Sequence, residues 1–196
     1  MKLCVLLTLL MTSVFIPSLS AIEPAPAANR AALASVPRVR AADARIKAAL
    51  AEGQQRSASF RRVLKRVEEL DVIVYVEMQP LLRRRLAGTT TWVTATTNFR
   101  YVRVSLNPGL SKFHIVAALA HELQHVAEIG GAPSIVDTRT LSDYYREVGV
   151  DKRETSDEWE TEAAKATGEM VRSELAEFAS VTSEPSTEIG LANGRD

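Results

Sequence analysis

Two histidines and a glutamate with the spacing of a metal-binding helix stand in the middle of the chain, in the segment His121-Glu122-Leu123-Gln124-His125. Histidines four residues apart lie on one face of a helix, so both imidazoles can reach one ion. Zinc accepts neutral imidazole nitrogen and, for catalysis, needs a third protein ligand and an open position for water. Glu122 is placed to take a proton from that water as a general base. The motif therefore predicts a catalytic zinc site.

The residues around the motif favour metal binding over an ordinary pair of helical histidines. The chain has 3 histidines in all, and the motif holds two of them. The preceding turns, from Ile115 to Ala120, are apolar and predict a buried helix, in which polar side chains need partners. The remaining histidine, His114, lies two turns before His121, about 10 Å along the axis, which is too far for the same ion. We interpret His114 as a structural residue; a residue that lines the cleft is the alternative.

The third ligand is expected to be an oxygen atom from a downstream carboxylate. No histidine or cysteine follows His125. The metzincin extension would need glycine at 128 and histidine at 131, whereas the chain has Glu128 and Gly131. The acidic C-terminal segment is the source that remains.

The choice among those acids rests on the face of a predicted C-terminal helix. Taking Trp159 as zero and about 100° per residue, Glu160 falls at about 100°, inside the apolar face. Glu174 also points inward, at about 60°, whereas Glu162 falls on the polar side. A carboxylate among apolar side chains is costly unless it binds something. Glu160 is therefore the predicted ligand and Glu174 its competitor.

The elements that position these residues follow from periodicity and end signals, and they predict an α+β domain with a small, mainly antiparallel sheet. We expect helices from 38 to 52 and from Ser59, and an apolar motif helix that Ser111 caps and that ends near Ile129. A short helix at 141–148 and a long one from a Thr155–Glu158 capping box to about Ser180 follow. Strands are expected at 71–76, 89–97 and 101–106, the last two forming a hairpin.

HExxH on one helix with a glutamate on a later one resembles the gluzincin class of zinc metallopeptidases, especially its small members. The resemblance covers about residues 70–180. It implies a zincin-like fold, peptide-bond hydrolysis, and His121, His125 and Glu160 as zinc ligands. In that class an aspartate commonly stands four residues after the glutamate and orients a histidine; here that residue is Ala164. The resemblance also implies that a peptide or protein substrate binds by strand addition along an edge strand at Tyr101–Leu106.

Two further groups have less specific patterns. Tyr144 and Tyr145 lie between the two metal-binding helices, as candidate oxyanion stabilisers or as anchors of a loop. The run Arg83-Arg84-Arg85 is typical of a solvated surface; a site of pro-segment cleavage and a contact for an anion are the alternatives.

The first twenty residues are typical of a signal peptide. Lys2 precedes an apolar run, Leu3–Ile16, that is shorter than the roughly 20 residues needed to span a bilayer. Ser18-Leu19-Ser20 supplies small residues for cleavage before Ala21. We therefore expect a secreted or periplasmic protein without a stable transmembrane anchor after cleavage; an uncleaved anchor is the alternative. The single cysteine, Cys4, lies in this segment, so the mature chain would have no thiol.

The predicted organisation is a signal peptide at 1–20, a leader and N-terminal helix at 21–55 that is a candidate pro-segment, a zincin-like catalytic domain at 56–180, and a disordered tail at 181–196. Equal numbers of basic and acidic residues, 24 each, argue against nucleic acid as a partner.

The predicted function is an exported zinc-dependent metallopeptidase. One alternative is an inactive envelope protein of the same fold that binds metal or a protein partner. Another is a partner-binding envelope protein with a fortuitous HExxH. Glu122 favours the peptidase, because metal binding alone needs no general base.

Overall fold

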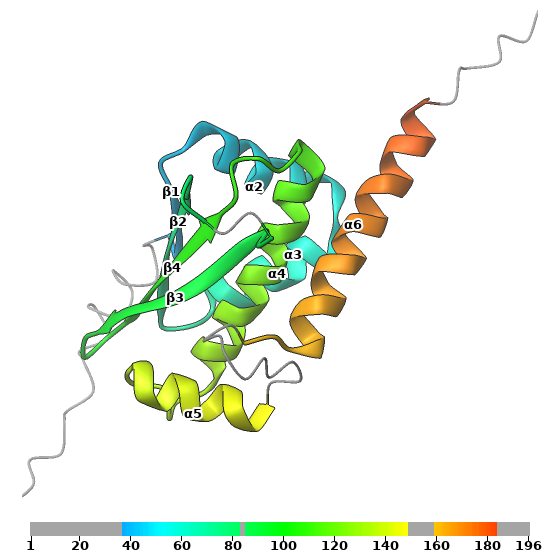
Figure 1. Ribbon diagram of the computed structural model, residues 1–196. Coiled ribbons are helices and arrows are strands. Elements are labelled where there is room, and N and C mark those ends of the chain that lie inside the picture. Colours follow the sequence, from blue (N-terminus) through cyan, green and yellow to red (C-terminus); the bar gives the residue numbers. More distant parts are fainter. Residues whose placement is uncertain (1–36, 83–84, 149–158, 184–196) are drawn as a thin grey trace, which may run out of the picture. The chain divides into compact units, whose positions relative to one another are not determined.

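A four-stranded sheet and five helices make up the described part of the chain. The computed structural model describes residues 37–82, 85–148 and 159–183, with side chains to residue 180 (Figure 1). The predicted signal peptide, the Thr155–Glu158 capping box and residues 184–196 lie outside these ranges. In chain order the elements are β1 (Val39–Ala41), α2 (Ala44–Arg56), α3 (Ala58–Glu68), β2 (Val72–Met78), β3 (Gly88–Ala95), β4 (Arg100–Leu106), α4 (Lys112–Gly131), α5 (Thr138–Val148) and α6 (Glu162–Ser183).

The strand order in the sheet is β1-β2-β4-β3. β1 and β4 both pair with β2 in parallel, and only β3 runs antiparallel, as the hairpin partner of β4. The α+β class and the hairpin are confirmed, but the expectation of a mainly antiparallel sheet is wrong. Val72, Ile73 and Val74 are all buried, and such a continuous apolar run is typical of an interior parallel strand.

The strand at Tyr101–Leu106 is not an edge strand, which corrects the predicted position of substrate binding. The chain leaves β2, forms β3, and returns as β4 between the two, so that Val74 and Trp92 both lie opposite Val102. The backbone of β4 is therefore paired on both sides, with β2 and with β3. The edges of the sheet are β1 and β3, and β3 lies beside the HExxH helix.

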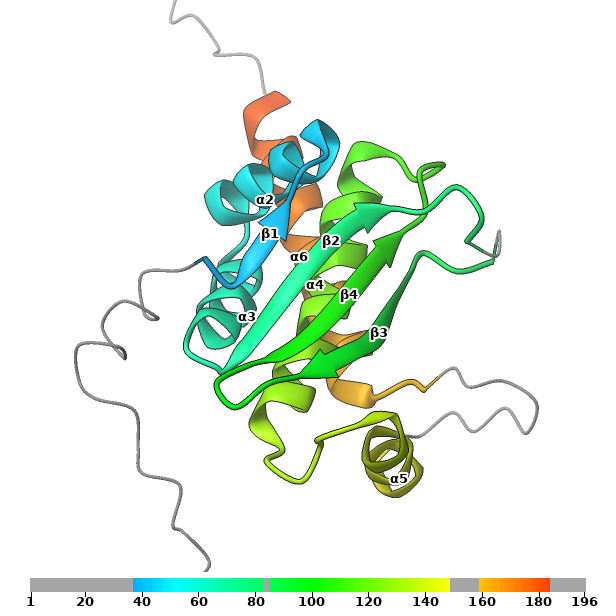
Figure 2. The same ribbon diagram turned by 90° about the vertical axis from the view of Figure 1, so that its left-hand side faces the viewer.

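α2 and α4 pack against one face of the sheet, and α3 and α6 pack against α4 (Figure 2). α4 is buried along most of its length because its residues are apolar or small, so it packs against both the sheet and α6. Its C-terminal end is held by Arg100 of β4, whose guanidinium donates to the carbonyl oxygens of Ile129, Gly130 and Ala132 at 2.7–2.9 Å. These bonds satisfy carbonyl groups that a helix end leaves without partners. They fix α4 relative to the sheet.

Residues 37–56 are part of the same folded unit as the rest of the described chain. β1 extends the sheet, and α2 buries Ile46 and Ala49 in the common core. The predicted helix from residue 38 is therefore wrong at its start, where β1 stands, and α2 continues past Gly53 to Arg56. The boundary predicted at residue 56 does not separate two units, because α2 and α3 share one core.

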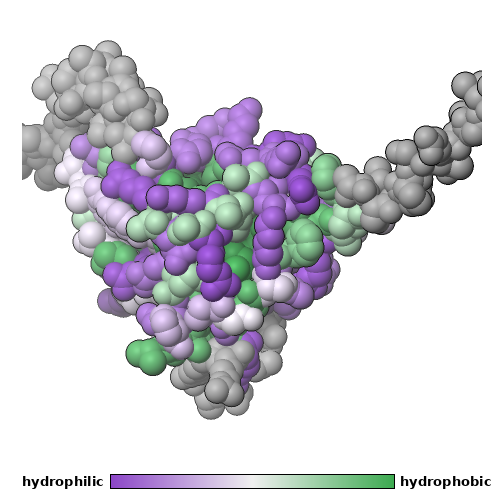
Figure 3. All heavy atoms as spheres, turned by 90° about the horizontal axis from the view of Figure 1, so that it is seen from above, coloured by the Kyte–Doolittle hydropathy of each residue, from purple (hydrophilic) through white to green (hydrophobic). Residues whose placement is uncertain are grey.

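The surface at the end where α4 begins and α6 ends is mainly hydrophilic, with hydrophobic residues in small groups among the polar ones (Figure 3). Within the described ranges, every helix is too short or too polar to cross a membrane.

Glu174 of α6 holds the start of α3. Its carboxylate accepts hydrogen bonds from the hydroxyl groups of Ser57 and Ser59 and from the backbone N–H of Ser59 at 3.1 Å. Ser57 in turn accepts from the N–H of Phe60 at 2.9 Å. Burial acts to raise the pKa of Glu174, but these hydrogen bonds outweigh it and lower the pKa. The inward direction predicted for Glu174 thus has a structural cause, helix capping.

Replacing Glu174 by alanine should lower the free energy of unfolding by about 1 kcal/mol, the usual contribution of a cap. Because the folded-state pKa is lowered, the contribution is complete above the unfolded value of about 4.3 and is lost as the pH falls below it. Urea unfolding at pH 7 and at successively lower pH measures both effects. Glu162→Ala, at an exposed site, is the control. Equal stability of Glu174→Ala and wild type at pH 7 would contradict the capping role.

Candidate metal centre

His121, His125 and Glu160 bring three ligand atoms together. The Oε1 atom of Glu160 lies 3.3 Å from Nε2 of His121 and 3.6 Å from Nε2 of His125. The three ligand atoms all lie within 4.8 Å of one another. Tetrahedral ligands at 2.0–2.1 Å from zinc are about 3.3 Å apart, and the two distances from Glu160 to the imidazoles are close to that value. Among the described residues this is the only such group of three, and it can hold a metal ion.

Glu160 reaches the site from a loop, not from the helix face that the sequence suggested. α6 begins only at Glu162, and Thr161 caps it by accepting the N–H of Ala164 at 3.1 Å. The N–H of Thr161 also donates to Oε1 of Glu160 at 3.0 Å and fixes the carboxylate. The predicted apolar stripe is partly wrong too, because Ala163 and Ala166 are exposed. The helical geometry that predicts Glu160 as the ligand is therefore wrong, although Glu160 lies at the site.

The two competing glutamates lie elsewhere. Glu162 is exposed and pairs with Lys165 at 3.5 Å. Glu174 is used in capping α3, as described above. Neither belongs to the group around the histidines.

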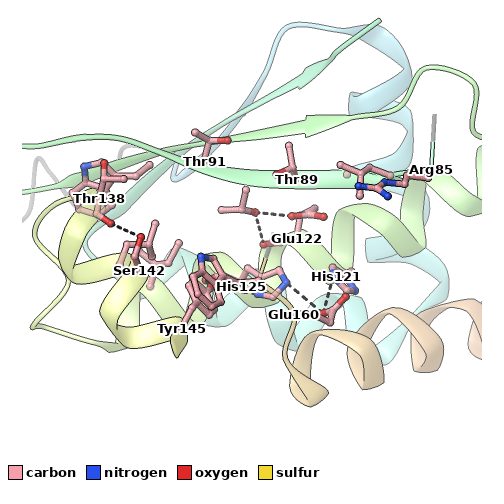
Figure 4. A pocket seen from close by; sticks show the side chains of 17 residues that line it. Arg85, Thr89, Thr91, His121, Glu122, His125, Thr138, Ser142, Tyr145 and Glu160 are labelled. Carbon is pink, nitrogen blue, oxygen red and sulfur yellow. Dashed lines mark hydrogen bonds and ion pairs between the residues drawn. The ribbon is translucent and has the colours of Figure 1, made fainter. Parts of the chain in front are cut away.

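Glu122 is buried between α4 and β3, beside the three ligands (Figure 4). The hydroxyl group of Thr90 donates to its Oε2 atom at 2.8 Å. Gly88 allows β3 to come this close, because a Cβ at that position would lie 2.7 Å from Oε1 of Glu122. Burial raises the pKa of Glu122, and His125, His121 and Thr90 oppose that shift only in part. A cation in the site would also favour the carboxylate form.

A second carboxylate, Glu128, stands behind His125. Its Oε2 atom lies 3.0 Å from Nδ1 of His125, and its Oε1 atom accepts from the hydroxyl group of Thr161 at 2.8 Å. The Tyr145 hydroxyl donates to the same carboxylate at 3.3 Å. Burial acts to lower the pKa of His125, but the hydrogen bonds with Glu128 and Glu160 raise it to about 9. With Nδ1–H donating to Glu128, Nε2 is the nitrogen left to bind a metal.

The two tyrosines are not placed as oxyanion stabilisers. The hydroxyl group of Tyr145 lies 3.3 Å from Nδ1 of His125, on the side of the ring opposite to the nitrogen that faces Glu160. Tyr144 packs edge-on against Tyr145, with ring centroids 5.2 Å apart, and does not line the cleft. The alternative interpretation, anchors of the local structure, fits both residues better.

The resemblance to gluzincins would place an aspartate at position 164, where it would orient His121. The chain has Ala164 at that position. Ala164 is fully buried and supplies no acceptor. α6 instead approaches His121 through Gly168, where a Cβ would lie 3.6 Å from Nδ1. Close packing of small residues, rather than a hydrogen bond from residue 164, therefore limits the movement of this ring.

The metal group lies in a cleft of about 730 Å³. One wall is β3, from Gly88 to Trp92, and the floor is α4. Thr138 and Ser142 of α5 lie toward one end and Arg85 toward the other (Figure 4). Arg85, the last residue of the basic run Arg83-Arg84-Arg85, thus lies at the mouth of the cleft. Arg83 and Arg84 lie outside the described residues. His114 is exposed, with its Nδ1 atom 2.7 Å from the Ser111 hydroxyl, as expected for a residue that does not bind the ion.

Three residues with contacts in the site were not found from the sequence. Glu128 had a usable signal, since it lies three residues after His125 on the same helix. Thr90 and Thr161 had none, because a threonine in a strand or before a helix is common. Their roles depend on contacts between β3, α4 and α6.

Comparison of the chain with protein-family models, curated proteins and solved structures finds no match. The site is therefore interpreted from its own chemistry.

Glu128→Ala should weaken zinc binding by about 10–100-fold, the usual effect of removing the partner of a ligating histidine. Glu128→Gln should recover part of the loss, since the amide oxygen can still accept from Nδ1–H. A competition titration with a zinc chelator measures the affinity, and circular dichroism checks the fold.

The control for this series is Glu147→Ala, an exposed glutamate of α5. If Glu128→Ala binds zinc with the affinity of wild type, Glu128 does not contribute to the metal centre. An equal loss in Glu147→Ala would show that the effect is not specific.

Proposed function

We propose that this protein is an exported zinc-dependent metallopeptidase, similar in its site to gluzincins. The convergence of two imidazole Nε2 atoms and one carboxylate oxygen, next to a buried glutamate in an open cleft, is the observation that supports the proposal most strongly. Two nitrogens and one oxygen suit zinc, and three protein ligands leave a position for water or substrate. Secretion or a periplasmic location is part of the proposal and rests on the N-terminal sequence.

When bound, zinc supplies a Lewis acid that polarises a carbonyl group and brings the pKa of a water molecule near 7. Glu122 takes the proton from the attacking water and returns it to the leaving amine, as a general base and then a general acid. Thr90 holds one oxygen of Glu122, which leaves Oε1 for the water. Glu128 keeps His125 in the tautomer that presents Nε2.

The substrate in this proposal is a peptide or protein segment in an extended conformation. Among the described strands, β3 is the edge strand that lines the cleft, so the backbone groups on its outer side can pair with such a segment beside the metal. This moves the predicted strand addition from Tyr101–Leu106 to Gly88–Ala95. The cleft is open, as a polymeric substrate requires.

The second candidate function is a metal-dependent binding protein without turnover. The absence of an aspartate at 164 favours it, because one histidine lacks the orienting carboxylate of the gluzincin pattern. The two functions differ in what they require of Glu122.

Glu122→Gln should keep zinc and the fold but lose hydrolysis by about 10²–10⁴-fold, because an amide cannot accept the proton. Turnover of a mixed library of quenched fluorescent peptides measures the loss, with Glu162→Gln as the control at an exposed site. A chelator should abolish wild-type turnover, and added zinc should restore it. Equal turnover in Glu122→Gln and wild type would show that Glu122 is not the general base. Wild-type protein that holds zinc and cleaves nothing would support the binding function.

A further inference from the structure

The cleft continues past the metal group into a second hollow, with a volume of about 340 Å³. The charged residues that line this hollow differ from those that line the cleft described above. Its floor is the N-terminal half of α4, where Ala117 and Ala118 leave room. Its walls are the segment Arg85–Gly88 and the turns of α6 from Lys165 to Arg172. His121, Glu122 and Glu160 line both hollows, so the metal group lies at their junction.

Apart from the metal centre, most of the charged side chains that line this second hollow are basic. Arg85 lines it from one wall and Lys165 and Arg172 from the other; among the described lining residues outside the metal centre, Glu169 is the only acid. Lys165 also pairs with Glu162 at 3.5 Å. His114 adds an imidazole, which contacts the Ser111 hydroxyl.

The opposite half of the cleft has a different lining. Beyond the metal centre and Arg85, its described lining is uncharged and consists mainly of hydroxyl, aliphatic and aromatic residues, among them Thr91, Trp92, Ile129, Ser142 and Trp159. Among the described lining residues, that half has no other charged group. A peptide across the metal would therefore meet neutral surroundings on one side and excess positive charge on the other.

We propose that the basic half of the cleft binds a carboxylate of the peptide substrate, on one fixed side of the bond that is cleaved. The inference rests on the proposed function and adds a substrate class to it. The carboxylate can come from an aspartate or glutamate side chain or from the C-terminus of the peptide. Either source would pair with Arg85, Lys165 and Arg172, which line the same hollow as His121 and Glu160 of the metal group.

The size of the preference follows from the exposure of these cations. Arg85 and Arg172 are exposed and Lys165 is half-buried, so each pair with a carboxylate is weakened by water. Three such cations together should favour a carboxylate over the matching amide by about threefold to tenfold. The preference should fade at 1 M salt, where the Debye length is about 3 Å.

The test compares matched peptides on the zinc-loaded mature chain. One series replaces glutamine by glutamate at each position on both sides of a cleaved bond, and a second pairs a C-terminal acid with the C-terminal amide. Cleavage rates are measured on wild type, and binding of the same fluorescent peptides is measured by anisotropy on Glu122→Gln. The expected result is a preference for the carboxylate on one side of the bond only.

The variants connect that preference to the basic hollow. Arg172→Glu should reduce the carboxylate-to-amide ratio at least threefold. Arg139→Glu makes the same change in net charge on α5, at an exposed residue outside the cleft, and should leave the ratio unchanged. A ratio near one in wild type, or an equal reduction in both variants, would overturn the inference.

The two readouts separate this inference from the proposed function. If peptides are cleaved without any preference for a carboxylate, the proposed function stands and the basic subsite is wrong. If nothing is cleaved but the carboxylate peptides bind more tightly and Arg172→Glu removes the difference, the subsite stands and the peptidase is wrong.

Discussion

The arrangement of this protein depends on one electrostatic constraint: three carboxylates stand around two imidazoles at the face of a largely apolar helix. Glu122 is buried, Glu128 lies behind His125, and Glu160 approaches both Nε2 atoms. Carboxylates removed from water are costly unless a cation or hydrogen bonds compensate them. A divalent ion at the point where the ligand atoms meet would balance this excess of negative charge.

The remaining elements can be understood as supports for that point. Gly88 and Thr90 allow β3 to approach and hold Glu122, while Thr161 both caps α6 and binds Glu128. Glu128 therefore connects the helix that carries the histidines to the segment that carries Glu160. Arg100 fixes the far end of α4 on the sheet. Sheet, helix and loop are thus each joined by polar contacts, which limits the freedom of the ligand atoms.

Features that depend on local pattern were predictable, and features that depend on distant contacts were not. The HExxH helix and the β3–β4 hairpin follow from periodicity and turn signals, and the helix begins after Ser111 as expected. The predicted cap is wrong, because the Ser111 hydroxyl contacts His114 and makes no capping hydrogen bond. β1 has three residues, too few to show a period, and it exists because β2 offers a parallel edge. The position of β4 between β2 and β3 has no signal in the local sequence pattern either. Helical periodicity places Glu160 on a helix face, whereas it lies before the helix, where its position depends on Thr161.

Metal analysis of the purified mature chain, never exposed to chelator, tests the central claim most directly. The account predicts about one zinc per chain in wild type, because two imidazoles and a carboxylate form an open tetrahedral site. It predicts that His121→Ala and Glu160→Ala lose most of this zinc and that Glu162→Ala keeps it. Wild-type protein without any transition metal would contradict the account. Zinc retained in Glu160→Ala but lost in Glu162→Ala would instead show that the third ligand is wrong.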